Sequence, residues 1–119
     1  MADLYEDDIL LWSERLGELL RRRAAGELVN EAELDWPNLA QEIESVGRSQ
    51  LSAVRSHIMQ AFPHDLKAEA WPTARDAPHW QSEARRARLD AAEAYTPSMR
   101  QRIDIARLYA KALRIMLES

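Results

Sequence analysis

The sequence contains no cysteine and only three glycines among its 119 residues. The absence of cysteine excludes a disulfide framework and a thiol nucleophile, and it fits a reducing compartment. Three scattered glycines give no support to a glycine-rich loop that cradles phosphates. The longest apolar stretch, Ile9 to Trp12, is far shorter than the roughly 20 residues that cross a membrane. The first eight residues are acidic where a secretory signal is basic, so we expect a cytoplasmic protein without a membrane contact.

Sequence support for β-strands is equally scarce. No segment alternates between apolar and polar residues, and no Asn-Gly or Asp-Gly hairpin turn occurs. Hydrophobic residues make up 46% of the chain and charged residues 30%, with a formal net charge of −4. Residues 1–62 hold 6 basic and 12 acidic side chains, whereas residues 63–119 hold 10 and 8. At this length one core is sufficient, and with no separating linker we predict a single domain over residues 1–119.

The apolar periodicity predicts helices. Residues at spacings of three and four indicate a first helix between Asp3, which caps it, and Gly26, which ends it. After a polar connector, Asp35 caps a second helix that has Pro37 in its first turn. The apolar stripe of this second helix continues for roughly six turns at 3.6 residues each. It reaches Pro63, which predicts a kink or a short break.

Two more helices follow a loop with two prolines. The third is expected over about Pro78 to Tyr95, with alanines along one side that predict close packing against a neighbour. The fourth starts at Thr96 and Pro97 and continues to the end of the chain. The predicted fold class is therefore all-α, either a four-helix bundle or an irregular helical array.

Histidine is the only side chain here that titrates near neutral pH unaided, so any general base or zinc site starts with His57, His64 and His79. Their spacing matches no zinc-binding motif, and no glutamate stands three residues before a histidine as in di-iron bundles. We interpret each as an exposed or hydrogen-bonded imidazole, and we expect no bound metal and no cofactor. A site formed by all three histidines is kept as an alternative.

The second half of the chain combines tryptophan with arginine, residue types that are enriched in protein-interaction hot spots. The candidate interaction surface consists of Trp71, Trp80, Arg85, Arg88 and Arg100. A wider arginine-rich face could meet phosphates, and it comprises Arg75, Arg85, Arg86, Arg88, Arg100, Arg102, Arg107 and Arg114. Interleaved acidic residues and the overall negative charge argue against nucleic acid as the partner.

Several short segments stand in an order that is typical of a known family. They are Tyr5-Glu6-Asp7-Asp8, Asp35-Trp36-Pro37-Asn38-Leu39-Ala40-Gln41-Glu42-Ile43-Glu44-Ser45-Val46-Gly47-Arg48-Ser49, His64-Asp65-Leu66-Lys67, Trp80 and Thr96-Pro97-Ser98-Met99-Arg100. In these segments the chain resembles the bacterial domain-of-unknown-function family number 29. It departs from the family pattern at Gln41, Pro63, Asp65 and His79. The resemblance implies a helical fold and a bacterial cytosolic setting, but no mechanism.

Four polar residues at family-like positions are candidates for a shared pocket, because polar side chains are seldom buried without partners. They are Glu42, Arg48, His64 and Lys67. The sequence favours a non-catalytic protein-interaction or regulatory module that binds another protein or a second copy of itself. The first alternative is a metal-dependent or acid–base enzyme centred on His64 with Glu42 or Lys67. The weaker alternative is nucleic-acid binding through the arginine-rich face.

Overall fold

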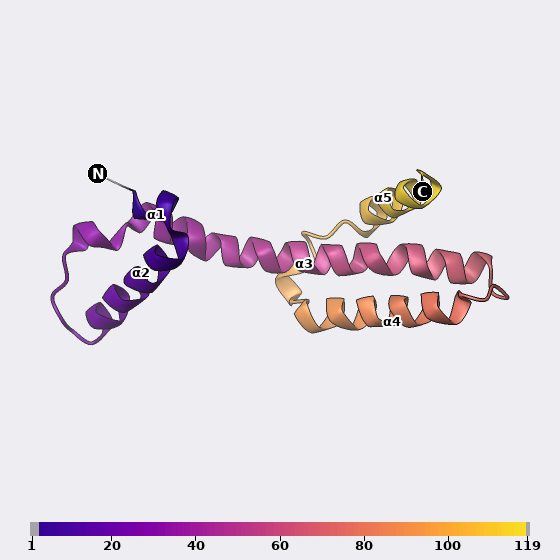
Figure 1. Cartoon of the computed structure of the whole chain (residues 1–119), viewed down its shortest axis with the longest axis horizontal. Helices are drawn as coiled ribbons and strands as arrows, with labels where there is room; N and C mark the ends of the chain where they lie inside the picture. The colour runs from indigo at the N-terminus through magenta and orange to yellow at the C-terminus, as the bar shows by residue number, and fades with distance from the viewer. Residues whose placement is uncertain (1–2, 119) are drawn as a thin grey trace. The chain divides into compact units, whose positions relative to one another are not determined.

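The computed structural model describes residues 3–118, and all regular elements in that range are helical. The α-helices are α1 (Leu4–Asp7), α2 (Ile9–Ala24), α3 (Trp36–Ala70), α4 (Ala77–Ala94) and α5 (Ile105–Glu118), with 3-10 turns η1 (Glu31–Leu34) and η2 (Pro97–Met99) between them (Figure 1). The predicted all-α helical array is confirmed. None of the helices described in this range is long and apolar enough to span a membrane. The described chain divides into two compact units, with the boundary between Val46 and Gly47, and they are described in turn.

The first predicted helix is two helices in the structure. Asp3 caps α1 as expected, its carboxylate accepting a hydrogen bond from the Tyr5 amide at 3.1 Å. Asp8 leaves the helical conformation and caps α2 in turn, accepting from the Leu11 amide at 3.0 Å. Two capping aspartates five residues apart therefore divide the segment, because each satisfies amides that helix ends leave unpaired. Helix α2 ends at Ala24, before Gly26. Gly26 has a φ of 88°, a conformation that glycine adopts at little cost.

The core of the first unit lies between α2 and η1. Trp12, Leu16 and Leu19 project from one face of α2 and bury against Leu34, which is fully buried at the end of η1. The sequence predicts only a polar connector in this part of the chain. Leu34 reaches the core because η1, which Asn30 caps through the Ala32 amide at 3.0 Å, turns the connector back toward α2.

Helix α3 continues through Pro63 to Ala70, so the long second helix is confirmed, and of the expected kink or short break the break does not occur. A proline at this position removes one backbone hydrogen bond and crowds the carbonyl of Met59, four residues earlier. Packing on both sides of the proline offsets that cost. Ala61 and Ala68 are buried, and the ring of Phe62 meets Tyr109 of α5 edge-to-face with centroids 5.5 Å apart.

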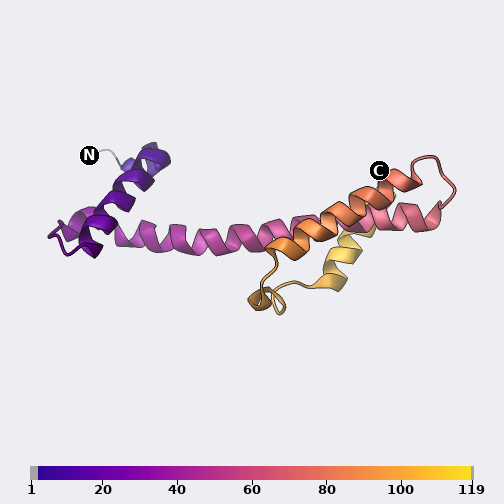
Figure 2. The same ribbon diagram turned by 90° about the horizontal axis from the view of Figure 1, so that it is seen from below.

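In the second unit, α4 runs antiparallel beside the second half of α3 (Figures 1 and 2). The predicted close packing of the alanine stripe is confirmed. The buried residues repeat every seven positions on both helices, as Val54, Ala61 and Ala68 on α3 and as Ala77, Ala84 and Ala91 on α4. A seven-residue spacing keeps side chains on one helix face, and small side chains there let two helix backbones approach closely.

The predicted fourth helix begins later than Thr96. Pro97–Met99 form only the turn η2, and α5 starts at Ile105, where the Asp104 carboxylate accepts a hydrogen bond from the Arg107 amide at 3.0 Å. This aspartate supplies a stronger capping group than Thr96, whose hydroxyl makes no capping bond. Ala112 of α5 is fully buried, so this helix belongs to the core of the second unit.

Candidate functional site

A cluster of hydrogen-bonded side chains joins α1 and α2 to the start of α3 in the first unit. The indole Nε1 of Trp12 donates to Oδ2 of Asp35 at 2.8 Å, and the Tyr5 hydroxyl donates to Oε1 of Glu42 at 2.6 Å. The rings of Tyr5 and Trp12 meet edge-to-face with centroids 4.9 Å apart. The side-chain amide of Asn38 donates to both oxygens of Asp35, at 3.2 and 3.0 Å. We call these five residues the Tyr5–Glu42 cluster.

Asp35 is the only non-glycine residue described with a positive φ, at 46° with ψ 54°. Aspartate tolerates this left-handed conformation better than most residues, and the hydrogen bonds from Trp12 and Asn38 hold it there. The side-chain hydrogen bond from Asn38, then that from Trp12, lowers the pKa of the Asp35 carboxyl below its ordinary value of 3.8. The hydrogen bond to Glu42 raises the pKa of the Tyr5 hydroxyl above 10.0, because it stabilises the protonated phenol.

The lowered pKa of Asp35 makes the stability of the first unit depend on acid. A carboxyl whose pKa is lower in the folded state stabilises that state above its unfolded pKa, and the contribution disappears as pH falls through the folded value. We expect Asp35→Asn to lower the free energy of unfolding near neutral pH and to have a smaller effect at about pH 2. Urea titrations followed by circular dichroism at both pH values measure this difference. An equal effect of the substitution at both pH values would contradict this prediction. Asparagine is the replacement because it also tolerates the left-handed backbone conformation.

The candidate pocket residues from the sequence lie in both units. Glu42 belongs to the first unit, where Tyr5 binds it, whereas Arg48, His64 and Lys67 belong to the second. Arg48 is exposed, and Lys67 is half-buried in the last turn of α3. The structure thus gives Glu42 a partner in the Tyr5–Glu42 cluster, which the sequence analysis did not identify. The available signal was the motif that starts at Asp35, because Asp35, Asn38 and Glu42 all fall within it.

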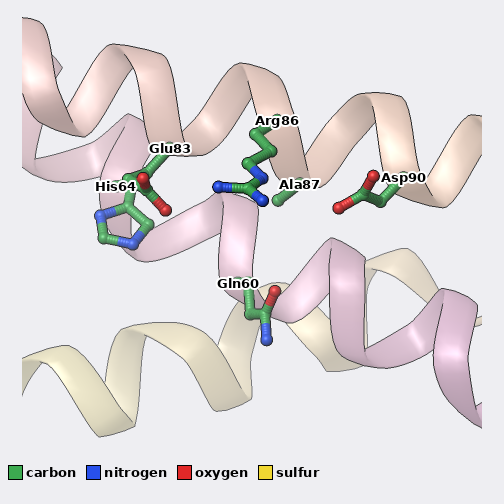
Figure 3. A pocket seen from close by; sticks show the side chains of 6 residues that line it. All are labelled: Gln60, His64, Glu83, Arg86, Ala87 and Asp90. Atoms are coloured by element: carbon green, nitrogen blue, oxygen red, sulfur yellow. The ribbon is translucent and has the colours of Figure 1, made fainter.

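His64 lines a pocket of ≈420 Å³ between α3 and α4 (Figure 3). Gln60 comes from α3 beside it, and Glu83, Arg86, Ala87 and Asp90 come from α4. Neither Arg48 nor Lys67 lines this pocket. The pocket mixes two carboxylates with one guanidinium group and one imidazole, and Nδ1 of His64 is buried without a hydrogen-bond partner among the described residues.

The three histidines are not gathered into one metal site. Across residues 3–118 no three His, Cys, Asp or Glu side chains are placed to hold a metal ion together. His57, like His64, is half-buried with its Nδ1 unpartnered, whereas His79 is exposed in the first turn of α4.

The predicted interaction surface is distributed along α4. Trp71 follows the last residue of α3 and is 56% exposed, and its ring lies 6.5 Å from that of half-buried Trp80, near the start of α4. Arg88 is engaged with Asp65 of α3, its Nη1 lying 2.7 and 2.5 Å from the two carboxylate oxygens. Arg85 is exposed and lies between Trp80 and Arg88 on α4. Arg100 follows η2, beyond the opposite end of α4. The structure brings the two tryptophans together, but an 18-residue helix, about 27 Å long, separates them from Arg100.

An exposed apolar stripe lies on α3 within the first unit. Ile43 and Val46 are each 65% exposed and Trp36 is 50% exposed, with half-buried Leu39 between them. At 100° per residue these four side chains fall within about 80° of the helix circumference. Glu42 and Asn38, which take part in the Tyr5–Glu42 cluster, lie outside this arc. Glu42, outside the arc, contacts Tyr5 of α1 through its carboxylate.

Over residues 3–118 the structure defines an all-α protein that is built from two small helical units and carries polar side-chain clusters. The family model described as "Domain of unknown function DUF29" matches residues 4–119, and the chain belongs to this family. The resemblance seen in the sequence motifs is therefore confirmed over nearly the whole chain. No curated protein and no solved structure matches it.

Proposed function

We propose that this protein is a non-catalytic interaction module that pairs with a second copy of itself through the apolar stripe of α3. The stripe is defined by Trp36, Leu39, Ile43 and Val46. The observation that carries the proposal is the exposure of three large apolar side chains, Trp36, Ile43 and Val46, within one arc of α3.

The spacing of the stripe supports a helix as its occupant. Its members alternate at intervals of three and four residues, which is the a and d pattern of a helix–helix seam. Side chains in this pattern interlock with the same pattern on a facing helix. An amphipathic helix is therefore a better fit than an extended peptide, which would present side chains with a period of two.

The chemistry of the stripe supports a second copy as the partner. The four members are uncharged, so the same surface on two copies can meet without like-charge repulsion. Two-fold contacts of this kind use one self-complementary patch twice. Burial of an isoleucine side chain contributes roughly 1.5–3 kcal/mol. Such a dimer buries Ile43 from both copies, which gives a substantial driving force from a short seam.

The pocket at His64 supports acid–base catalysis less well. Glu42 and Lys67, the partners expected from the sequence, do not line it. The guanidinium group of Arg86 stands between Glu83 and Asp90 on α4, and either carboxylate can neutralise it. Such mixed charge is also common on solvated helix surfaces. The stripe, in contrast, gathers three exposed large apolar side chains on one arc of a helix.

Analytical ultracentrifugation of the purified chain tests the proposal. We expect a dimer that dissociates on dilution, and we expect Ile43→Glu to raise its dissociation constant by more than about a hundredfold, since both copies lose a buried isoleucine. Ser52→Glu is the matched control, because it adds the same charge at an exposed polar position of the same helix. A wild-type protein that stays monomeric at every concentration would overturn the proposal, and so would equal weakening by both substitutions.

A further inference from the structure

A second hollow in the residue 47–119 unit has a different chemical character from the His64 pocket. It has a volume of ≈380 Å³, within the range of about 300–1,000 Å³ that is usual for ligand sites. Three segments contribute to it. Arg55 comes from α3, Arg102 and Asp104 come from the segment between η2 and α5, and Arg107, Leu108 and Lys111 come from the first turns of α5. We call it the basic pocket.

Local hydrogen bonds hold the walls of the basic pocket in place. Nη2 of Arg55 donates to the backbone carbonyl of Arg102 at 2.6 Å, which ties the segment before α5 to α3. Oδ1 of Asp104 accepts from the backbone amide of Arg107 at 3.0 Å and so fixes the start of α5. Arg107 and Lys111 are four residues apart and therefore project from one face of α5. Leu108, half-buried, supplies an apolar part of the lining.

The charge of the basic pocket is strongly one-sided. Four cationic side chains line it against a single carboxylate, that of Asp104, which is already engaged as the cap of α5. Within residues 3–118 the ion pairs formed by arginine involve Arg15, Arg22, Arg23 and Arg88, and none involves a cation of this pocket. The surrounding unit is itself basic, with 12 basic and 8 acidic side chains in residues 47–119. Four cations against one carboxylate leave an excess of three positive charges (4 − 1 = 3) in the lining of the pocket.

We propose that the basic pocket binds a phosphoryl anion. A phosphoryl group offers several acceptor oxygens and up to two charges, and the planar fork of a guanidinium group binds such oxygens in pairs. Three arginines and a lysine provide donors from more than one direction, which favours a multiply charged phosphate over a single carboxylate. The site does not depend on the self-association proposed for α3, because none of its residues belongs to the apolar stripe.

Isothermal titration of the folded, full-length chain with inorganic pyrophosphate at low salt tests this site. We expect saturable binding that is weakened by at least about tenfold in Arg107→Gln, which removes one charge-assisted contact. Lys111→Gln should weaken binding in the same direction. Arg114→Gln is the matched control, since it removes the same charge from an exposed position of α5 that does not line the pocket. Circular dichroism shows whether each variant keeps its helix content.

A labelled single-stranded oligonucleotide, titrated in parallel, identifies the source of the phosphoryl group. Tighter binding of the oligonucleotide than of pyrophosphate, lost in Arg107→Gln, would assign the site to a nucleic-acid backbone. Binding of pyrophosphate alone would assign it to a small phosphorylated ligand. The proposal is overturned if neither probe binds saturably, or if Arg114→Gln weakens binding as much as Arg107→Gln, because the attraction would then come from diffuse charge.

Discussion

Replacement of Trp12 by alanine should lower the free energy of unfolding of the first unit by about 3–5 kcal/mol, the usual cost of removing a buried large aromatic side chain. Trp12 is 5% exposed and belongs to the core with Leu16, Leu19 and Leu34. The substitution also removes the edge-to-face contact with Tyr5 and the indole donor to Asp35. Because Asp35 holds a left-handed backbone conformation at the start of α3, we expect the junction between η1 and α3 to loosen as well.

Amide hydrogen exchange measures this loss separately for α2 and α4. We expect much faster exchange in α2 of the Trp12→Ala protein and nearly unchanged exchange in α4. Trp71→Ala is the matched control, since Trp71 is 56% exposed and its loss should cost little. Trp12→Phe keeps an aromatic ring in the core but removes the indole donor. Its effect on exchange in α2 should therefore lie between those of Trp12→Ala and Trp71→Ala. An equal effect of Trp12→Ala and Trp71→Ala on α2 would show that the core assignment is wrong.

Pro63→Ala should instead raise the free energy of unfolding of the second unit, by about 2 kcal/mol. Proline inside a helix costs about 3 kcal/mol relative to alanine. Alanine also gives the unfolded chain more conformational freedom, which reduces the expected stabilisation by about 0.4–1 kcal/mol. Pro63 lies well inside α3, which continues for seven residues beyond it. The substitution restores an amide that can donate to the Met59 carbonyl.

Pro37→Ala is the matched control for this second prediction. Pro37 stands in the first turn of α3, where the amide has no helical partner and proline costs nothing. Urea titration followed by circular dichroism should show a higher midpoint for Pro63→Ala and no gain for Pro37→Ala. A lower midpoint for Pro63→Ala would mean that the ring of Pro63 contributes more through packing than the missing hydrogen bond costs.

The two proposals predict two separable properties, self-association and anion binding. Self-association depends on apolar contacts of α3 in the first unit and should persist at high salt. Anion binding depends on exposed charges of the second unit and should weaken as salt screens them. Measurement of the dimer dissociation constant with and without pyrophosphate would show whether the two properties are coupled. Coupling would make the basic pocket a regulatory site of an interaction module.

Local patterns were sufficient to predict most of the helices. The apolar periodicity located α2, α3 and α4, and the positions of Asp3, Asp35 and Gly26 set boundaries that the structure confirms. The alanine stripe predicted the close packing of α4. Each of these features is a property of residues within one or two turns of one another, so the sequence alone determines them. Family membership could also be predicted, because it depends on the order of short motifs.

Other features depend on competition between neighbouring signals or on contacts across the fold. Asp8 and Asp104 cap helices α2 and α5 at positions where the sequence predicts a helix that has already begun. Pro63 remains helical because Ala61, Phe62 and Ala68 are held by neighbouring helices. Propensity at a single position is worth only a few kcal/mol, so such packing overrides it.

The sites show the same division between sequence and tertiary structure. The residue types of the Tyr5–Glu42 cluster and of the basic pocket are visible in the sequence, but the long-range hydrogen bonds in them join partners 23 to 47 positions apart. No helical or strand periodicity relates positions that distant. The sequence determined which side chains can bind, and the tertiary structure decided which of them meet, because only the folded chain brings the donors of one helix to the acceptors of another.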